Sequence, residues 1–180
     1  MENGTLNLLR GDSNLKGRLS DGQLHGQLQI DELARPQARL NYQHGQLHGP
    51  VTLYHPNGKV AAELPYAHDK VHGTARFYAS EGGLQRQASY QHGRLHGQAC
   101  TYFADGSVAE RTHYRDGVLE GPLERFHNNG QVAFSAHYVR GVPVEPGRGF
   151  SQDGRLLSAA GKPVSRMRSW WDSLFVQPQG

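Results

Sequence analysis

The strongest constraint on this 180-residue chain is an internal repeat with a period of 24 residues. A fixed period of this length is typical of repeat architectures in which each unit stacks mainly on its neighbours. Two glycine columns, two aromatic columns and two apolar columns keep the same phase, which excludes chance. These columns are Tyr42, Tyr66, Tyr90, Tyr114 and Tyr138; Tyr54, Tyr78, Tyr102, Phe126 and Phe150; Gly49, Gly73, Gly97 and Gly121; Gly58, Gly82, Gly106, Gly130 and Gly154; Val60, Leu84, Val108 and Val132; and Leu47, Val71, Leu95 and Leu119.

Each unit is expected to form two short antiparallel strands. Residues 97–106 form a strand-rich run that ends at Asp105-Gly106, a favoured hairpin turn. On the return strand, Val132 is expected to share a face with Phe134, because side chains alternate along a strand. A second turn at 91–94 then leads into the next unit. The sequence therefore predicts an all-β fold, an elongated antiparallel meander of ~24-residue β-hairpin repeats.

Composition agrees with short strands and many turns. Glycine accounts for 23 of the 180 residues, and 36% of the residues are hydrophobic. The mean hydropathy of −0.68 is low for a protein with a deep core. No apolar stretch approaches the ~18 residues that a membrane-spanning helix needs, and the N-terminal residues do not resemble a signal peptide.

The repeat weakens at both ends of the chain. Residues 19–26 match residues 42–49, but at a step of 23 residues rather than 24. Near the other end, Pro143 and Glu145 replace the expected leucine and glycine. We therefore divide the chain into an N-terminal cap or degenerate repeat (1–18), the repeat array (19–157), and a linker with a C-terminal helix (158–180).

The repeat units resemble a known family. The run Tyr-Gln-His-Gly-Arg-Leu-His-Gly at 90–97, followed by Tyr102 and Asp105-Gly106, resembles the MORN repeat in its variant form. Among proteins with such repeats, the chain looks most like bacterial YwqK-type antitoxins. This resemblance implies an immunity or antitoxin-type protein, or alternatively a scaffold associated with anionic lipids. A fold alone does not decide between these functions.

The last residues depart from the repeat and predict a short amphipathic helix. Met167, Trp170, Trp171, Leu174 and Phe175 follow helical spacing and form one apolar stripe. A helix of this kind suits a cap over the exposed last strand, the interpretation that we favour. A helix that docks a partner and a helix at a membrane interface are the alternatives.

The histidines recur with the repeat, but the sequence offers no complete site for catalysis or metal binding. His48, His72 and His96 form one column, with His25 one residue out of step, and a second column contains His44, His68 and His92. Stacked units could bring these rings near one another, and imidazole is a common ligand of zinc and copper. No cysteine or carboxylate accompanies them at ligand spacing, so we interpret them as turn residues copied with the repeat. The single Cys100 is expected to be an unreactive thiol. We therefore expect a protein that is not an enzyme and that holds neither metal nor cofactor.

The charge distribution disfavours nucleic acid as a partner. The net charge of the chain is +3. Residues 139–171 carry +4, and the remaining residues together carry −1. Within the repeats, basic residues alternate with acidic ones, as with Arg111 beside Glu110, so no continuous track for phosphates forms. We interpret the aromatic columns as packing positions rather than as a platform for stacking bases.

The favoured function is that of an immunity protein that neutralises a cognate secreted toxin by direct contact. Its contacts are expected at positions that break the repeat, because the repeated positions are needed for folding. The sequence leaves the compartment open between the bacterial cytoplasm and, if a leader has been removed, the periplasm, and it also leaves the oligomeric state open. Membrane contact is not favoured. The predicted partner-binding residues are Arg76, Arg86, Glu110, Arg111, Glu124, Arg125, Trp170 and Trp171.

Overall fold

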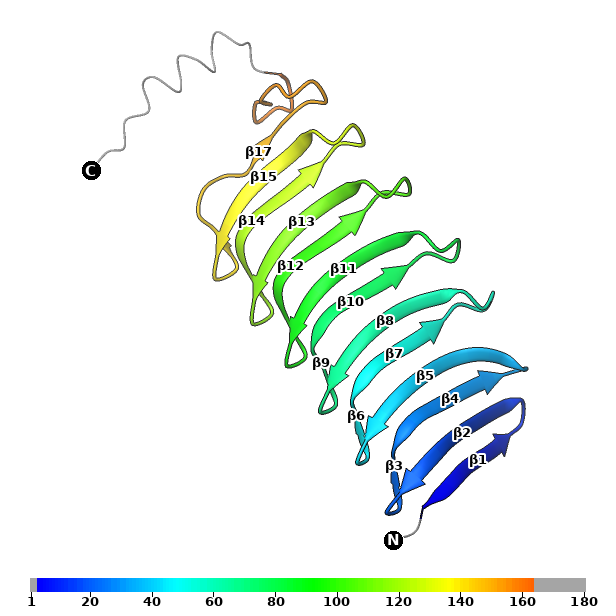
Figure 1. The fold of residues 1–180 in the computed structure, drawn as a ribbon. Coiled ribbons are helices and arrows are strands. Elements are labelled where there is room, and N and C mark those ends of the chain that lie inside the picture. Colours follow the sequence, from blue (N-terminus) through cyan, green and yellow to red (C-terminus); the bar gives the residue numbers. More distant parts are fainter. Residues whose placement is uncertain (1–2, 164–180) are drawn as a thin grey trace.

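The computed structural model describes residues 3–163, which form one long antiparallel sheet (Figure 1). Each longer strand pairs with the next longer strand of the chain, so the topology is a meander without crossovers. The two ends of the sheet lie far apart, because each hairpin adds its width to the same row. The predicted all-β fold, an antiparallel meander of hairpins, is thus confirmed.

Seventeen strands make up the sheet. The short strands of two residues adjoin the turns and continue the pairing of a longer neighbour. Their bounds are β1 (Gly4–Arg10), β2 (Ser13–Ser20), β3 (Gln23–Leu24), β4 (Gly26–Glu32), β5 (Arg35–Gln43), β6 (Gln46–Leu47), β7 (Gly49–Tyr54), β8 (Val60–Ala67), β9 (Lys70–Val71), β10 (Gly73–Tyr78), β11 (Leu84–Gln91), β12 (Arg94–Tyr102), β13 (Val108–Arg115), β14 (Val118–Phe126), β15 (Val132–Val139), β16 (Val142–Pro143) and β17 (Arg148–Gly149).

Turns of two kinds alternate along the two long edges of the sheet. At the edge that we call the tight-turn edge, His92 and Gly93 join β11 to β12 with φ angles of 51° and 84°. Two successive positive φ angles define a type I′ turn, which suits the twist of antiparallel strands. At the opposite, long-turn edge, five residues separate β12 from β13, and Gly106 N–H donates to the Phe103 carbonyl.

The Asp-Gly dipeptide therefore does not form the two-residue hairpin that its sequence suggests. Gly106 has a φ of 85°, whereas Asp105 is not in the left-handed region. The Asp105 carboxylate instead accepts hydrogen bonds from the backbone N–H and the hydroxyl of Ser107. Those bonds hold the pKa of Asp105 below its usual value, that from the Ser107 hydroxyl making the largest contribution.

The 23-residue step has a local cause. Between β4 and β5, Leu33 and Ala34 replace the five-residue long turn with a two-residue turn, in which their φ angles are 50° and 61°. The strands on either side are longer, but the unit is one residue shorter in total. The first hairpin, β1–β2, is joined to the same sheet without a break, and residue 18 lies inside β2.

Bulges next to both kinds of turn change which face a side chain occupies. Near the tight turns, three residues of β12 (His96, Gly97 and Gln98) lie opposite one residue of β11. Gly97 has a φ of 94° there, a conformation that a residue with a side chain rarely adopts. Near the long turns, Val132 pairs with Phe126 while Phe134 pairs with Arg125. Because Phe126 and Arg125 point to opposite faces, Val132 and Phe134 do so as well, and their predicted common face is wrong.

Among residues 3–163, the nine buried residues all lie on one face of the sheet, which we call face A, and the other face is called face B. Ala75 and Ala88 are directly paired across strands and are completely buried, with 0% exposure. The described residues form no second layer, so this burial comes from larger side chains on neighbouring strands of the same face. The buried residues are Leu28, Ala38, Val51, Ala62, Ala75, Ala88, Ala99, Thr112 and Leu123.

The C-terminal end of the array closes irregularly. After β16 the chain leaves the sheet, and it returns as β17 to pair with β15. Gly147, in the connecting loop, lies so close to the Phe134 ring that a side chain at position 147 would collide with it. The predicted helix and its Trp170 and Trp171 lie outside the described residues. Within the described part of the chain, no helix is long and apolar enough to cross a membrane.

Two adjacent glycines give a matched test of the long turns. Gly82 has a φ of 101°, whereas Gly83 does not adopt a positive φ and has open space around its Cα. We expect Gly82→Ala to lower the free energy of unfolding by about 1–2 kcal/mol, since the left-handed backbone strains a residue with a side chain. Gly83→Ala is expected to be neutral or to stabilise by up to about 1 kcal/mol. Urea denaturation measures both, and equal losses in the two variants would contradict the assigned turn.

Candidate functional site

The predicted contact residues divide between the two faces of the sheet. Arg111 pairs with Glu124 on face B, while Glu110 pairs with Arg125 on face A. Of the two remaining arginines, Arg76 lies on face B and Arg86 on face A. One flat partner surface therefore cannot contact all six residues. The sequence did not reveal this division, because it depends on the positions of the bulges.

Four of these six residues form cross-strand ion pairs. Arg111 Nη1 lies 3.1 Å from Glu124 Oε2, and Arg125 Nε lies 2.9 Å from Glu110 Oε2. Arg111 also lies over the Phe126 ring at 5.3 Å, and Arg125 lies over Phe134 at 5.8 Å. These side chains therefore also help to hold β13 and β14 in register. Within residues 3–163, Arg76 and Arg86 form no ion pair.

A continuous row of mostly polar residues crosses face B, and we call it the polar row. Each residue is the direct cross-strand partner of the next, from β1 to β17. At a strand spacing of ~4.8 Å, the row extends for roughly 55–60 Å. Its members are Asn7, Lys16, Gln29, Arg39, Thr52, Glu63, Arg76, Gln87, Cys100, Arg111, Glu124, Ser135 and Arg148.

The polar row varies from unit to unit, although the architecture does not. One set of repeat-equivalent positions holds Arg39, Glu63, Gln87, Arg111 and Ser135. With five basic residues and two acidic ones, the row has a net charge of +3. Chemistry that changes at positions with constant geometry is the property expected of a recognition surface.

An aromatic column runs beside the polar row on the same face. The Tyr78 hydroxyl donates to Glu63 Oε2 at 2.8 Å, and the Arg39 guanidinium lies over the Tyr54 ring at 5.7 Å. Burial, followed by the hydrogen bond to Glu63, raises the pKa of Tyr78. Tyrosine and arginine side by side are the residue types most often found at the energetic centres of protein interfaces. Cys100 lies in the row, half-buried, between the strands that carry Gln87 and Arg111.

The tight-turn edge brings the two histidine columns together in pairs. The ring centroids of His25 and His44 are 5.2 Å apart, those of His48 and His68 are 5.3 Å apart, and those of His72 and His92 are 5.2 Å apart. In every pair the rings meet edge to face. We call these six residues the histidine pairs.

A repeated backbone hydrogen bond places the histidine pairs. Gly45 N–H donates to the Leu24 carbonyl at 2.9 Å, which sets His44 beside His25. An equivalent hydrogen bond, from a backbone N–H of the tight turn to a carbonyl of the preceding unit, recurs along the array. It joins Asp69 to Leu47, Gly93 to Val71, Gly117 to Leu95, and Gly141 to Leu119. In the fourth position of this series the pair becomes His96 with Asp116, whose atoms Nδ1 and Oδ1 are 3.4 Å apart.

Other histidines have structural roles at the long-turn edge. The His55 Nε2 is 2.9 Å from the Tyr78 carbonyl of the next unit, and His127 Nε2 is 2.8 Å from the Phe150 carbonyl. The side-chain amide of Asn57 donates a hydrogen bond to the Ser80 carbonyl, and that of Asn129 donates one to the Gln152 carbonyl. These contacts tie the long turns at 55–59 and 127–131 to the turns that follow them.

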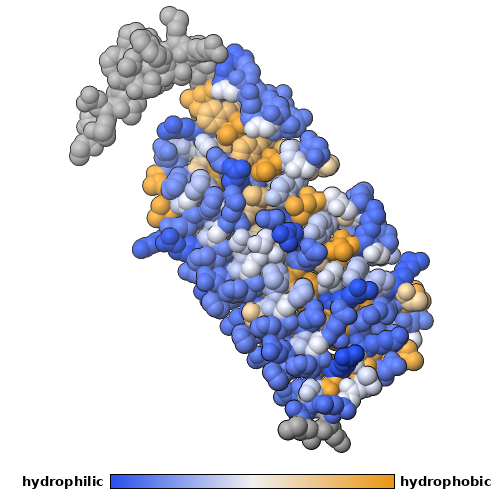
Figure 2. Space-filling model, viewed as in Figure 1, coloured by the Kyte–Doolittle hydropathy of each residue, from blue (hydrophilic) through white to orange (hydrophobic). Residues whose placement is uncertain are grey.

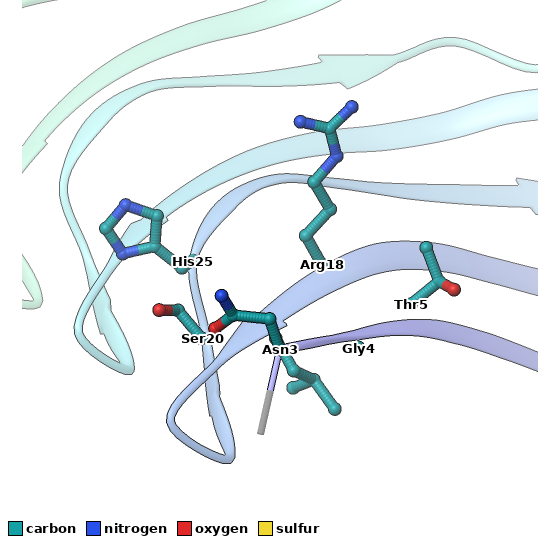
Figure 3. Close-up of a pocket in the computed structure, with 7 residues that line it drawn as sticks. Asn3, Gly4, Thr5, Arg18, Ser20 and His25 are labelled. Carbon is teal, nitrogen blue, oxygen red and sulfur yellow. The ribbon is translucent and has the colours of Figure 1, made fainter. Parts of the chain in front are cut away.

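An open depression of about 450 Å³ lies at the first hairpin. Figure 3 shows Asn3, Ser20 and His25 near the tight turn, with Thr5 and Arg18 farther along β1 and β2. The space-filling view shows a largely hydrophilic surface, on which the largest apolar area lies near the C-terminal end of the array (Figure 2).

Comparison with known proteins identifies the repeat. The sequence matches the MORN repeat variant four times in tandem, at residues 47–68, 71–92, 95–116 and 119–140. The chain therefore contains a tandem array of MORN repeat variants and is a repeat protein of the scaffold type that binds partners. This match names the repeat and no particular partner.

The other comparisons add little. No curated protein matches this chain. Among solved structures, it is similar to the crystal structure of accessory secretory protein 1, 2 and 3 in Streptococcus pneumoniae, with 12% sequence identity and a TM-score of 0.25. The match covers 66% of this chain and 19% of that protein's chain.

The two ion pairs of β13 and β14 can be tested by double-mutant cycles. Their side chains are between 31% and 60% exposed, so solvent screens both pairs. We expect coupling free energies of about 0.2–1 kcal/mol for Arg111–Glu124 and for Arg125–Glu110, measured by denaturant unfolding of single and double alanine variants. A coupling above about 2 kcal/mol would mean that the pairs are much less solvated than the structure indicates.

Proposed function

We propose that this chain is an immunity protein that binds a toxic protein through face B and neutralises it by occlusion, without chemical modification. The polar row is the observation that carries the proposal. It offers charged and polar side chains whose order changes along the row, on strands whose direct cross-strand pairing continues from β1 to β17. The neutralising role rests on the resemblance of the repeats to YwqK-type antitoxins.

Face B suits a protein partner for two reasons. A standard interface buries about 800 Å² on each partner, which a few adjacent hairpins supply. Tyr54, Tyr78 and Tyr102 provide large, half-buried rings next to arginines, so a partner gains contact area without ordering many flexible side chains. The net charge of +3 along the row favours an acidic surface and speeds its association.

The role is tested by co-expression with the protein encoded by the neighbouring open reading frame. We expect that protein to stop bacterial growth alone and to be harmless when this chain is present. The two purified proteins should form a complex whose affinity falls as ionic strength rises. A harmless neighbour, or toxicity that this chain does not relieve, would reject the immunity role.

Two arginines that lie on neighbouring strands but on opposite faces decide which face binds. We expect Arg76→Glu to weaken the complex by at least about tenfold, because it reverses a charge within the polar row. Arg86→Glu makes the same change on face A and should alter the affinity by less than about twofold. Calorimetric titration measures both, with urea unfolding as the control for the fold. The opposite order would move the interface to face A.

Vesicles give the competing scaffold function its own test. In a flotation assay with vesicles of phosphatidylcholine and phosphatidylserine, an immunity protein should remain with the soluble fraction. Ion pairs within the basic C-terminal region support this expectation, since Arg148 pairs with Glu145 and Arg155 pairs with Asp153. Binding to anionic vesicles without any protein partner would favour the lipid-associated scaffold.

A further inference from the structure

We propose that each of the three histidine pairs binds one zinc ion, which joins a tight turn to the preceding unit. The proposal departs from the expectation, drawn from the sequence, that the chain holds no metal, and it does not depend on the identity of the protein partner. It arises from a juxtaposition that is not visible in the sequence, since the two members of a pair are 19 or 20 residues apart and belong to different columns.

The backbone places the two histidines of a pair side by side before any metal binds. His48 lies in a bulge, where its N–H donates to the Asn41 carbonyl at 2.9 Å. Its partner His68 lies in a tight turn that the Asp69 N–H holds against the Leu47 carbonyl at 3.0 Å. The same two hydrogen bonds recur at the other pairs, which explains why all three centroid distances agree within 0.1 Å. Two ligands held in this way lose little freedom when they bind one ion.

The separation fits a shared metal ion. Zinc binds imidazole nitrogen at ~2.0–2.1 Å and prefers tetrahedral geometry, which places two coordinated rings with their centroids about 5 Å apart. The observed distances are 5.2 to 5.3 Å. The rings would have to turn about their side-chain torsions, out of the edge-to-face arrangement, to direct one nitrogen of each toward the same point.

The ring nitrogens are accessible. His25, His44, His68, His72 and His92 are exposed and His48 is half-buried. Within residues 3–163, the two rings of a pair share no hydrogen bond, although His68 Nδ1 lies 3.2 Å from Gln46 Oε1. Gln46 leaves the other nitrogen of His68 available for a metal.

Each site would hold zinc through two protein ligands only. No group of three or more histidine, cysteine or acidic residues in the described chain is arranged to hold a metal. Water would complete the coordination, so the ions should exchange readily, unlike those of a closed structural site. The fourth position of the series, His96 with Asp116, has a carboxylate in place of the second imidazole and is not included.

The experiment counts bound zinc in the full chain by equilibrium dialysis against zinc chloride. We expect three ions for each chain, and two after His44→Asn. Asparagine tolerates the left-handed conformation of His44, whose φ is 50°, so the turn is retained. His137 is an exposed histidine outside the pairs, so His137→Asn is the matched control and should leave three ions bound.

Pairing is tested by combining substitutions. The His25→Asn and His44→Asn variants should each lose one ion, and the double variant should also lose only one, because both residues serve the same site. The His44→Asn and His68→Asn double variant should lose two. Zinc should also raise the thermal unfolding midpoint, by less in each variant than in the unsubstituted chain, because binding to the folded state stabilises it. No bound zinc, or losses that add within a pair, would overturn the proposal.

Discussion

A sheet without a second layer depends for its stability on contacts between neighbouring strands within the sheet. Most domains bury the apolar face of one layer against another, but in the described part of this chain every strand belongs to one sheet. Backbone pairing between neighbours and small buried side chains such as Ala75 and Ala88 replace the usual core. The hydrogen bonds from each tight turn to the preceding unit extend this lateral support to the edge. Regular spacing is therefore a condition of stability, and the 24-residue period is its consequence.

The 24-residue period predicted the fold well because it follows directly from the pairing of each unit with its neighbours. Aromatic and apolar columns recur at positions that pair across strands, and turn residues recur where the chain reverses. The sequence was less informative about side-chain direction. Each bulge inserts residues that shift the alternation, so Val132 lies on the face opposite to the predicted one.

The same limitation affected the candidate site. The six predicted charged contacts broke the repeat, as expected of residues that recognise a partner, but two pairs of them also connect β13 to β14. The polar row was missed because its members come from two different sets of repeat positions. Only the register of cross-strand pairing shows that these two sets lie side by side in one row. The sequence suggested that stacked units could bring histidine rings near one another, but it did not show that His44 pairs with His25, since that pairing depends on a hydrogen bond between the backbones of two units.

The one-dimensional arrangement also has an evolutionary consequence. Because the strands pair only with their chain neighbours, duplication of one 24-residue unit would add a hairpin without altering the packing of the others. Each added hairpin would insert two new residues into the polar row and lengthen it by about 10 Å. Lineages that gain or lose one repeat could thereby change the length and charge sequence of the recognising surface in a single genetic step. A conventional two-layer domain, whose core is shared by all its strands, does not permit such a change.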